Sequence, residues 1–379
     1  GGIGAGFRDY WDVMGKSPTV AGGFFWAWSD EGVVRTDEGG RIDNVGNNAP
    51  DGMVGPHREL EGSYHAVKAI WSPVQVKLPA KLPKDFDGRV SLENHYSFTN
   101  LNRCSFEWEW LAFPSPRKTA ATQVVKSGML TPPDIASGKV GEILFPVPQD
   151  PEHALRLIVK DPTGQEVLRA VSAPREFGGK VTLEMHSPNP IVWKTENELR
   201  VSNSHRTTFV FDLITGELKE VAGRSQRLPV VNGPRFIALR RNQRQFGNLS
   251  EQSVLKRINH KKDEFGGVVV EITYEGALQK VIWGFPPGSP NVTLDYEFTL
   301  NAETDIAGIR FDLPESALKS KRWLGHGPYR VWQNRQEGGV FDLHEVAFND
   351  PIPGQTYAYP EFKGFFRDVD ATVAQANEK

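Results

Sequence analysis

The chain has 379 residues, a net charge of −3 and a pI of about 6.4. This charge balance gives no support for nucleic acid or an anionic membrane surface as a partner. No stretch approaches the roughly 20 consecutive apolar residues that a membrane span needs. The one cysteine, Cys104, excludes an intrachain disulfide and a metal site built on thiolates. Its place in an alternating run predicts a small, buried side chain.

The length allows two or three domains. Glycine and proline are plentiful, with 37 and 27 residues, which favours many short strands joined by turns. The ten tryptophans have two interpretations. They fill the cores of large β-sandwiches, or they form flat platforms on which sugar rings stack.

The first 31 residues have the pattern of a helix that leads into a buried strand. Four apolar residues recur at helical spacing: Phe7, Tyr10, Trp11 and Met14. Pro18 ends that segment, and the apolar run 21–28 then predicts a strand that is buried on both faces. A helix that feeds such a strand is typical of a (β/α)8 barrel, whose active site lies at the C-terminal ends of the strands. Residues 26–31 are expected there.

The middle of the chain predicts an immunoglobulin-like β-sandwich. Residues 90–98 and 106–111 alternate between apolar and polar, which marks strands with one buried face. Further short strands are expected at 142–146, 155–160 and 166–170. About seven strands in roughly 100 residues suit this sandwich fold. A connector over 178–197 then leads to more β structure, so the predicted fold class is mainly β.

Several motifs resemble those of glycoside hydrolase family 2, in particular the large β-galactosidases. Tyr10-Trp11-Asp12-Val13 and residues 22–32 resemble the last repeat of the family's catalytic barrel. Residues 51–58 and 63–74 resemble the family's exit from that barrel, with His57 where Asp is usual. The later matches follow in the family's order and are 94–101, 233–236, 323–335 and 359–364. Arg330 and Asn334 stand where Glu and Asp are usual, which suggests an altered sugar subsite.

The resemblance implies a domain order for the whole chain. Residues 1–70 are expected to be the C-terminal remnant of a (β/α)8 catalytic barrel, and residues 71–177 an immunoglobulin-like β-sandwich. Residues 178–370 are expected to form a galactose-mutarotase-like β-supersandwich, and residues 371–379 a tail. The nucleophile glutamate is expected a few residues before Gly1 and the acid/base glutamate further upstream. This chain alone is therefore expected to be inactive.

The resemblance also implies substrate contacts for six residues. Trp26 stands where the family has an indole that walls the bound sugar, although a barrel-core role is the alternative. Asp51 matches a position that reaches a sugar hydroxyl or helps hold a cation, although Asp51-Gly52 also suits a plain turn. Asn48 is a companion in the same loop. Trp332 and Glu361, together with Tyr329, are candidates for a sugar-facing edge; core packing is the alternative.

Other polar residues are expected to have structural roles. Asp30 is expected to hold the barrel rim through hydrogen bonds, and Glu107 and Glu109 to lie on a solvated strand face. His57 and His65 fit no metal-ligand spacing, and His326, between two glycines, is expected to cap backbone in a turn. No metal ligand can therefore be assigned, although the complete protein could use a bound cation.

Two classes of function follow from these features. The first is the C-terminal part of a retaining glycoside hydrolase that acts on β-galactosides, or on another sugar within the family. The second is a non-catalytic carbohydrate-binding or interaction protein built from the β domains. The expected partner in either case is a carbohydrate, and a homo-oligomer is possible. No signal peptide is visible, and a periplasmic or secreted location is compatible with the first class.

Overall fold

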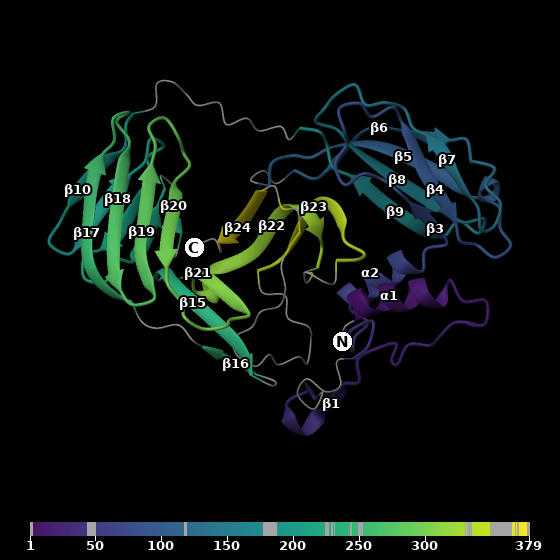
Figure 1. Ribbon diagram of the computed structural model, residues 1–379, viewed down its shortest axis with the longest axis horizontal. Helices are drawn as coiled ribbons and strands as arrows, with labels where there is room; N and C mark the ends of the chain where they lie inside the picture. The colour runs from purple at the N-terminus through teal and green to yellow at the C-terminus, as the bar shows by residue number, and fades with distance from the viewer. Residues whose placement is uncertain are drawn as a thin grey trace. The chain divides into compact units, whose positions relative to one another are not determined.

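The computed structural model is drawn in Figure 1. It describes residues 3–43, 51–116, 120–176, 188–223, 227–228, 230, 232–242, 245–248, 253–329, 331, 336–348, 366–367, 369 and 371–376. The chain forms two compact units. The first comprises residues 1–180, 320–357 and 362–375, and the second comprises 181–319, 358–361 and 376–379. Strands dominate both units, so the predicted mainly β class is confirmed.

The first unit begins with two helices, α1 (Ile3–Met14) and α2 (Gly62–Ile70). The helix expected from the spacing of the first aromatic residues is therefore confirmed. Between the two helices lies a small hairpin of β1 (Val33–Arg35) and β2 (Arg41–Asp43), closed by the 3-10 turn η1 (Thr36–Glu38). No described helix has both the length and the apolar character needed to cross a membrane.

The expected barrel strand over residues 21–28 is wrong. This segment has no strand assignment, and the side chains of Phe24, Trp26 and Trp28 are exposed. A parallel strand becomes buried on both faces only where other strands flank it and helices cover it. Within the described residues, the segment's only strand-like partner is the short stretch around Val54. A piece of (β/α)8 barrel is therefore not shown.

Seven strands follow α2 and form a two-layer sandwich, as the sequence predicts. They are β3 (Val74–Val76), β4 (Arg89–Asn94), β5 (Ser105–Ala112), β6 (Gln123–Leu130), β7 (Val140–Leu144), β8 (Ala154–Lys160) and β9 (Glu166–Ser172). One sheet has the order β3-β4-β7 and the other β6-β5-β8-β9. The 3-10 turn η2 (Leu101–Arg103) joins β4 to β5. Inward-facing residues of both sheets form one core, in which Phe106, Leu155 and Leu157 are fully buried.

Cys104 is buried in this core, as expected, but it follows η2 and does not lie within a strand. A third sheet of the first unit has the order β23-β22-β24, formed by β23 (Val340–Ala347), β22 (Leu318–Gly327) and β24 (Ala371–Ala376). The 3-10 turn η3 (Glu315–Ala317) precedes β22. His326 lies in β22, so the turn expected at this histidine is wrong. Leu324 and Phe341 of this sheet pack with Ala173 at the end of the sandwich.

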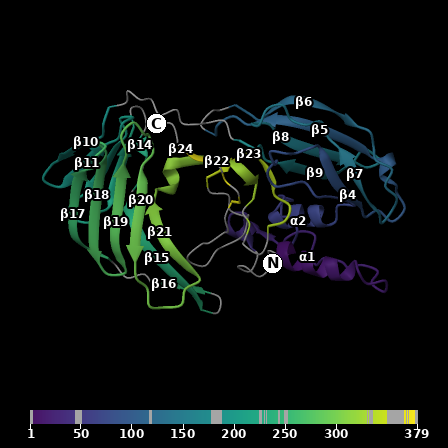
Figure 2. The same ribbon diagram turned by 45° about the horizontal axis from the view of Figure 1, so that its top comes forward.

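The described residues of the second unit form three antiparallel sheets. The first has the order β10-β11-β12-β13-β14, which are Ile191–Lys194, Glu198–Ser202, Thr208–Asp212, Leu218–Ala222 and Arg227–Leu228. The second has the order β17-β18-β19-β20, which are Val254–Lys262, Val268–Glu275, Leu278–Phe285 and Thr293–Phe298. The third has the order β16-β15-β21, which are Gln245–Asn248, Asn232–Asn242 and Ile306–Asp312. Figure 2 shows β17–β20 side by side.

One hydrophobic core joins these sheets. It includes the fully buried residues Phe211, Phe285 and Ile272 and the nearly buried Trp283. The expected three-domain division stays a prediction. The expected supersandwich, residues 178–370, spans both compact units. Residues 320–357 group with the first unit, and residues 181–319 form most of the second.

Candidate functional site

The segment that carries Trp26 is attached to the segment that carries Asp51 by a short parallel pairing. Ser29 and Val54 form a parallel bridge. The carbonyl of Trp28 accepts from the backbone N–H groups of Met53 and Val54 at 3.0 and 3.2 Å, and Asp30 N–H donates to the carbonyl of Val54 at 2.9 Å. Met53 and Val54 are buried. Two of the loops that the sequence singles out are therefore held side by side at this point.

Asp30 anchors this pairing from a buried position. Its side chain is 4% exposed, and its Oδ1 atom accepts a hydrogen bond from the N–H of Gly52 at 2.8 Å. A buried carboxylate must be satisfied in this way, because an unpaired polar group costs free energy when it leaves water. The structural hydrogen bond expected of Asp30 is therefore present, but the barrel rim that it is expected to hold is not shown.

Glu61 is a second carboxyl group in the same cluster. It lies directly before α2 and interacts with Asp30. Burial, followed by the charge and hydrogen bond of Asp30, raises the pKa of Glu61 to about 7. Burial also raises the pKa of Asp30 above its usual range. The two groups therefore favour a shared proton, with Glu61 as its holder over most of the acidic range.

Asp51 borders this pair, and its negative charge acts on Asp30. The Oδ1 atom of Asp51 is buried and has no hydrogen-bond partner among the described residues. Within the part of the chain that the structure describes, no group of three or more His, Cys, Asp or Glu side chains is placed to hold a metal ion. The carboxylates around Asp30 thus do not form a cation site by themselves.

Trp26 lies in the open while its neighbour points inward. The indole of Trp26 is 85% exposed, and Phe24 is fully exposed. Phe25 instead packs on the rings of Phe7 and Trp71, with centroids 4.7 and 5.1 Å apart. Trp11 of α1 completes this aromatic cluster. The core alternative for Trp26 therefore does not describe this structure, in which the inward anchor is Phe25.

The connection after β22 packs against the two helices. Tyr329 stacks on His65 of α2 with ring centroids 4.9 Å apart, and burial lowers the pKa of that histidine. Gly338, at a φ of 87°, comes so close that a Cβ would lie 2.4 Å from the carbonyl carbon of His65. Arg8 of α1 forms a bidentate ion pair with Glu337 at 3.1 and 3.3 Å. Tyr329 thus faces α2, and the same contacts position the chain on either side of residues 332–335.

Three of the candidate residues lie outside the described residues: Asn48, Trp332 and Glu361. Their roles as sugar contacts stay predictions, as do those of Trp26 and Asp51. The sequence does not single out Glu61 as a candidate. This residue lies directly before α2 but makes no side-chain cap hydrogen bond there, and only the fold brings it to Asp30.

The solvated face expected for Glu107 and Glu109 needs correction. Both are only partly exposed, and each pairs across the strands with a basic residue of β8. Glu107 pairs with Lys160 at 2.6 Å, and Glu109 pairs with Arg156.

The first unit also contains a cavity of about 850 Å³, between α1, α2, β9 and the start of β23. Neither Trp26 nor Asp51 lines it. Of the predicted sugar contacts that the structure describes, Trp26 and Asp51 therefore lie outside this cavity.

No family model matches the chain. It is 29% identical over 112 residues to a β-galactosidase of Priestia megaterium, a match that spans 26% of this chain and 10% of that protein. It is 29% identical over 104 residues to a β-galactosidase of Oenococcus oeni, spanning 24% of this chain and 10% of that protein. The match to a β-galactosidase of Vibrio cholerae is 30% over 83 residues, or 19% of this chain and 8% of that protein.

Two solved structures are similar at low identity. The exo-chitosanase of Amycolatopsis orientalis matches with a TM-score of 0.20 and 10% identity, over 65% of this chain and 29% of that one. The β-D-mannosidase of Dictyoglomus thermophilum matches with a TM-score of 0.17 and 14% identity, over 45% of this chain and 20% of that one. The curated relatives thus confirm the resemblance to large β-galactosidases that the motifs predict, over about a quarter of this chain.

Proposed function

We propose that this chain is the C-terminal part of a retaining glycoside hydrolase that acts on β-galactosides. The order of the motifs and the β-galactosidases among its relatives support this proposal. The observation that carries it is the bridge between Ser29 and Val54, supported by the hydrogen bond from Gly52 to Asp30, which holds the segment of Trp26 beside that of Asp51.

The residues of this chain then bind and orient the substrate and do not break the bond. Retaining glycosidases need a nucleophile and a proton donor whose carboxyl groups are roughly 5–5.5 Å apart and both reach the sugar. Asp30 and Glu61 do not fit this role, because Asp30 is buried and already accepts from Gly52. Both catalytic glutamates of the proposal therefore lie outside these 379 residues.

Trp26 and Asp51 have separate tasks in this proposal. The indole of Trp26 covers an apolar face of the sugar ring, and the partly exposed carboxylate of Asp51 accepts a hydrogen bond from a sugar hydroxyl. The bridge between Ser29 and Val54 holds the segments of the two residues beside each other.

The test compares the 379-residue chain with the complete protein encoded by its gene. Both are assayed on nitrophenyl β-galactoside, β-glucoside, β-mannoside and β-glucuronide. The complete protein should show its highest kcat/KM on the β-galactoside, and the shorter chain should not exceed a blank without protein. Turnover by the shorter chain overturns the placement of the glutamates. A preference for another sugar overturns the substrate, and sugar binding without any turnover favours a carbohydrate-binding protein.

A further inference from the structure

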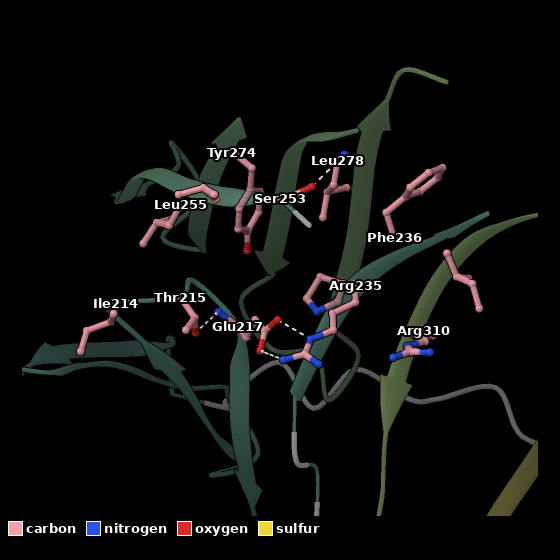
Figure 3. Close-up of a pocket in the computed structure, with 13 residues that line it drawn as sticks. Ile214, Thr215, Glu217, Arg235, Phe236, Ser253, Leu255, Tyr274, Leu278 and Arg310 are labelled. Carbon is pink, nitrogen blue, oxygen red and sulfur yellow. Dashed lines mark hydrogen bonds and ion pairs between the residues drawn. The ribbon is translucent and has the colours of Figure 1, made fainter. Parts of the chain in front are cut away.

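A second cavity lies entirely in the second unit, whereas Trp26 and Asp51 belong to the first unit. Its volume is about 390 Å³, which is within the range of small-molecule sites. The turn between β12 and β13, the strand β15, and the ends of β17, β18 and β19 form its wall. Figure 3 shows these side chains, with Tyr274 pointing from its strand toward the turn that carries Thr215.

The wall contains a pair of planar charged groups, Arg235 and Glu217. The Nε and Nη2 atoms of Arg235 donate to the two carboxylate oxygens of Glu217 at 2.6 and 3.0 Å (Figure 3). This pairing uses two of the five donor hydrogens of the guanidinium and leaves acceptor capacity on the carboxylate. Donors and acceptors are thereby fixed next to each other at the rim. Such a pair matches the neighbouring hydroxyls of a polyol.

The charges of the wall compensate each other. Arg235 is paired with Glu217, and the Nε atom of Arg310 lies 3.5 Å from a carboxylate oxygen of Asp312. A phosphate or carboxylate ligand would therefore meet a carboxylate beside each arginine, and like charges repel at such distances. The wall favours a neutral ligand.

Hydroxyl groups and an apolar floor supply the rest of the lining. Ser253 accepts from Leu278 N–H at 3.1 Å through its Oγ atom, and Thr215 accepts from Glu217 N–H at 3.2 Å through its Oγ1 atom. A hydroxyl that accepts one hydrogen bond still has a proton to donate. The aromatic residues Phe236 and Tyr274 are each only 7% exposed, so no open aromatic face is present in the lining for a nucleobase to stack on.

The turn that carries Thr215 and Glu217 is held in place by Gly216. Its φ of 74° is in the left-handed region, and a Cβ here would lie 2.8 Å from the Tyr274 hydroxyl. Tyr274 donates a hydrogen bond of 3.1 Å to the carbonyl of this glycine. The polar rim is thus fixed to the buried core before any ligand binds, which lowers the entropic cost of binding.

We propose that this cavity binds a neutral saccharide unit, with the Arg235–Glu217 pair at its hydroxyls and Leu255 and the exposed Ile214 against its apolar face. This site is separate from the proposed catalytic function and does not require turnover. It would hold a sugar on the second unit independently of Trp26.

The test uses the full 379-residue chain with galactose, glucose and lactose, each titrated by calorimetry and by saturation-transfer NMR. Arg235→Ala and the isosteric Glu217→Gln should each weaken the binding of at least one sugar by about tenfold or more, the equivalent of about 1.4 kcal/mol. The matched control is Arg240→Ala, because Arg240 lies on the same strand and pairs with Glu303 at 2.8 Å outside the cavity. Arg240→Ala should leave this binding unchanged, and the losses caused by Arg235→Ala and Glu217→Gln should persist when Trp26→Ala is added.

Several outcomes overturn the proposal. The first is that none of the three sugars binds saturably. The second is that Arg240→Ala weakens sugar binding as much as Arg235→Ala does. The third is that inorganic phosphate displaces the bound sugar at a lower concentration than a second neutral sugar does. Loss of binding in Trp26→Ala alone places the sugar on the first unit and also overturns it. Thermal unfolding of every variant shows that it is folded. Because Glu217→Gln keeps the shape of the side chain, it decides the matter if Arg235→Ala does not fold.

Discussion

The backbone N–H of Gly52 donates a hydrogen bond of 2.8 Å to the buried carboxylate of Asp30. The same glycine lies so close to the segment around Asp30 that a Cβ at position 52 would come within 2.2 Å of the Asp30 nitrogen and 2.3 Å of the Ser29 carbonyl carbon. These atoms belong to the backbone and cannot rotate away. One contact therefore fixes the distance between the segment of Trp26 and that of Asp51.

We expect Gly52→Ala to break this contact. The added methyl must push the two segments apart, and overpacking of this kind costs about 1–3 kcal/mol. The first unit should lose that amount of unfolding free energy in urea titrations. Gly6→Ala is the control, because a Cβ added at this position in α1 would have no atom within 4 Å, and alanine is about 0.5–1 kcal/mol better than glycine within a helix. Equal stability of Gly52→Ala and the unmodified chain would contradict the close approach.

The carboxyl pair of Asp30 and Glu61 predicts a pH dependence. The pKa of Glu61 rises from its usual 4.5 to about 7 on folding, mainly through burial and then through Asp30. The folded state therefore binds this proton more tightly than the unfolded state. Its contribution to stability is fully present below about pH 4.5 and is lost as the pH rises toward 7. The raised pKa of Asp30 acts in the same direction.

Glu61→Gln isolates this effect, because the amide cannot ionise. We expect the variant to be more stable than the unmodified chain at about pH 8, and the difference to shrink as the pH falls from about 7 to about 4.5. Urea unfolding of both proteins at about pH 4.5, 6 and 8 measures it, and titrating groups that do not interact with Glu61 cancel in the difference. A difference that does not change with pH would mean that Glu61 ionises in the folded state as it does in water.

The sandwich can be predicted because its strands carry their own pattern. Residues 105–112 alternate in burial along β5, so the period of two is visible in the sequence. The sequence does not predict the strand β6, and the reason is physical. It is an edge strand with most of its residues exposed, including Val124 and Val125, so it has no buried face to impose alternation.

The candidate site is predictable only where local chemistry determines it. The sequence indicates Asp30 as an anchor, and the structure gives it a backbone partner. The apolar run 21–28 predicts burial, but burial depends on neighbouring elements and not on the run itself. Glu61 cannot be found from the sequence, because its partner lies 31 residues earlier in the chain and only the fold brings the two together.

The two ion pairs between β5 and β8 should differ in strength. Arg156 and Glu109 are 14% and 18% exposed, whereas Lys160 and Glu107 are 37% and 31% exposed. Removal of Glu109 leaves a largely buried guanidinium whose next carboxylate, Asp342, is 3.9 Å away. We expect Glu109→Ala to cost about 1–3 kcal/mol, between the values for exposed and fully buried pairs. Glu107→Ala, the matched control on the same strand, should cost less than about 1 kcal/mol. Equal losses in urea titrations would show that burial does not decide between the pairs.

The proposed role of Trp26 in turnover is tested in the complete protein. An indole that covers a sugar ring contributes apolar contact and positioning of about 1–3 kcal/mol, and each decade of kcat/KM corresponds to about 1.4 kcal/mol. Trp26→Ala should therefore lower kcat/KM on a β-galactoside by roughly ten- to a hundredfold. The melting temperature should change little, because the indole is 85% exposed and contributes little packing. Phe98→Ala is the control, since this ring is 96% exposed in the connection between β4 and β5, outside the segment of Trp26, and should be neutral for both activity and stability. The contrary outcome is that Trp26→Ala lowers the melting temperature while the activity per folded molecule stays normal. The indole then packs against the rest of the complete protein. The sugar contact then belongs to another residue.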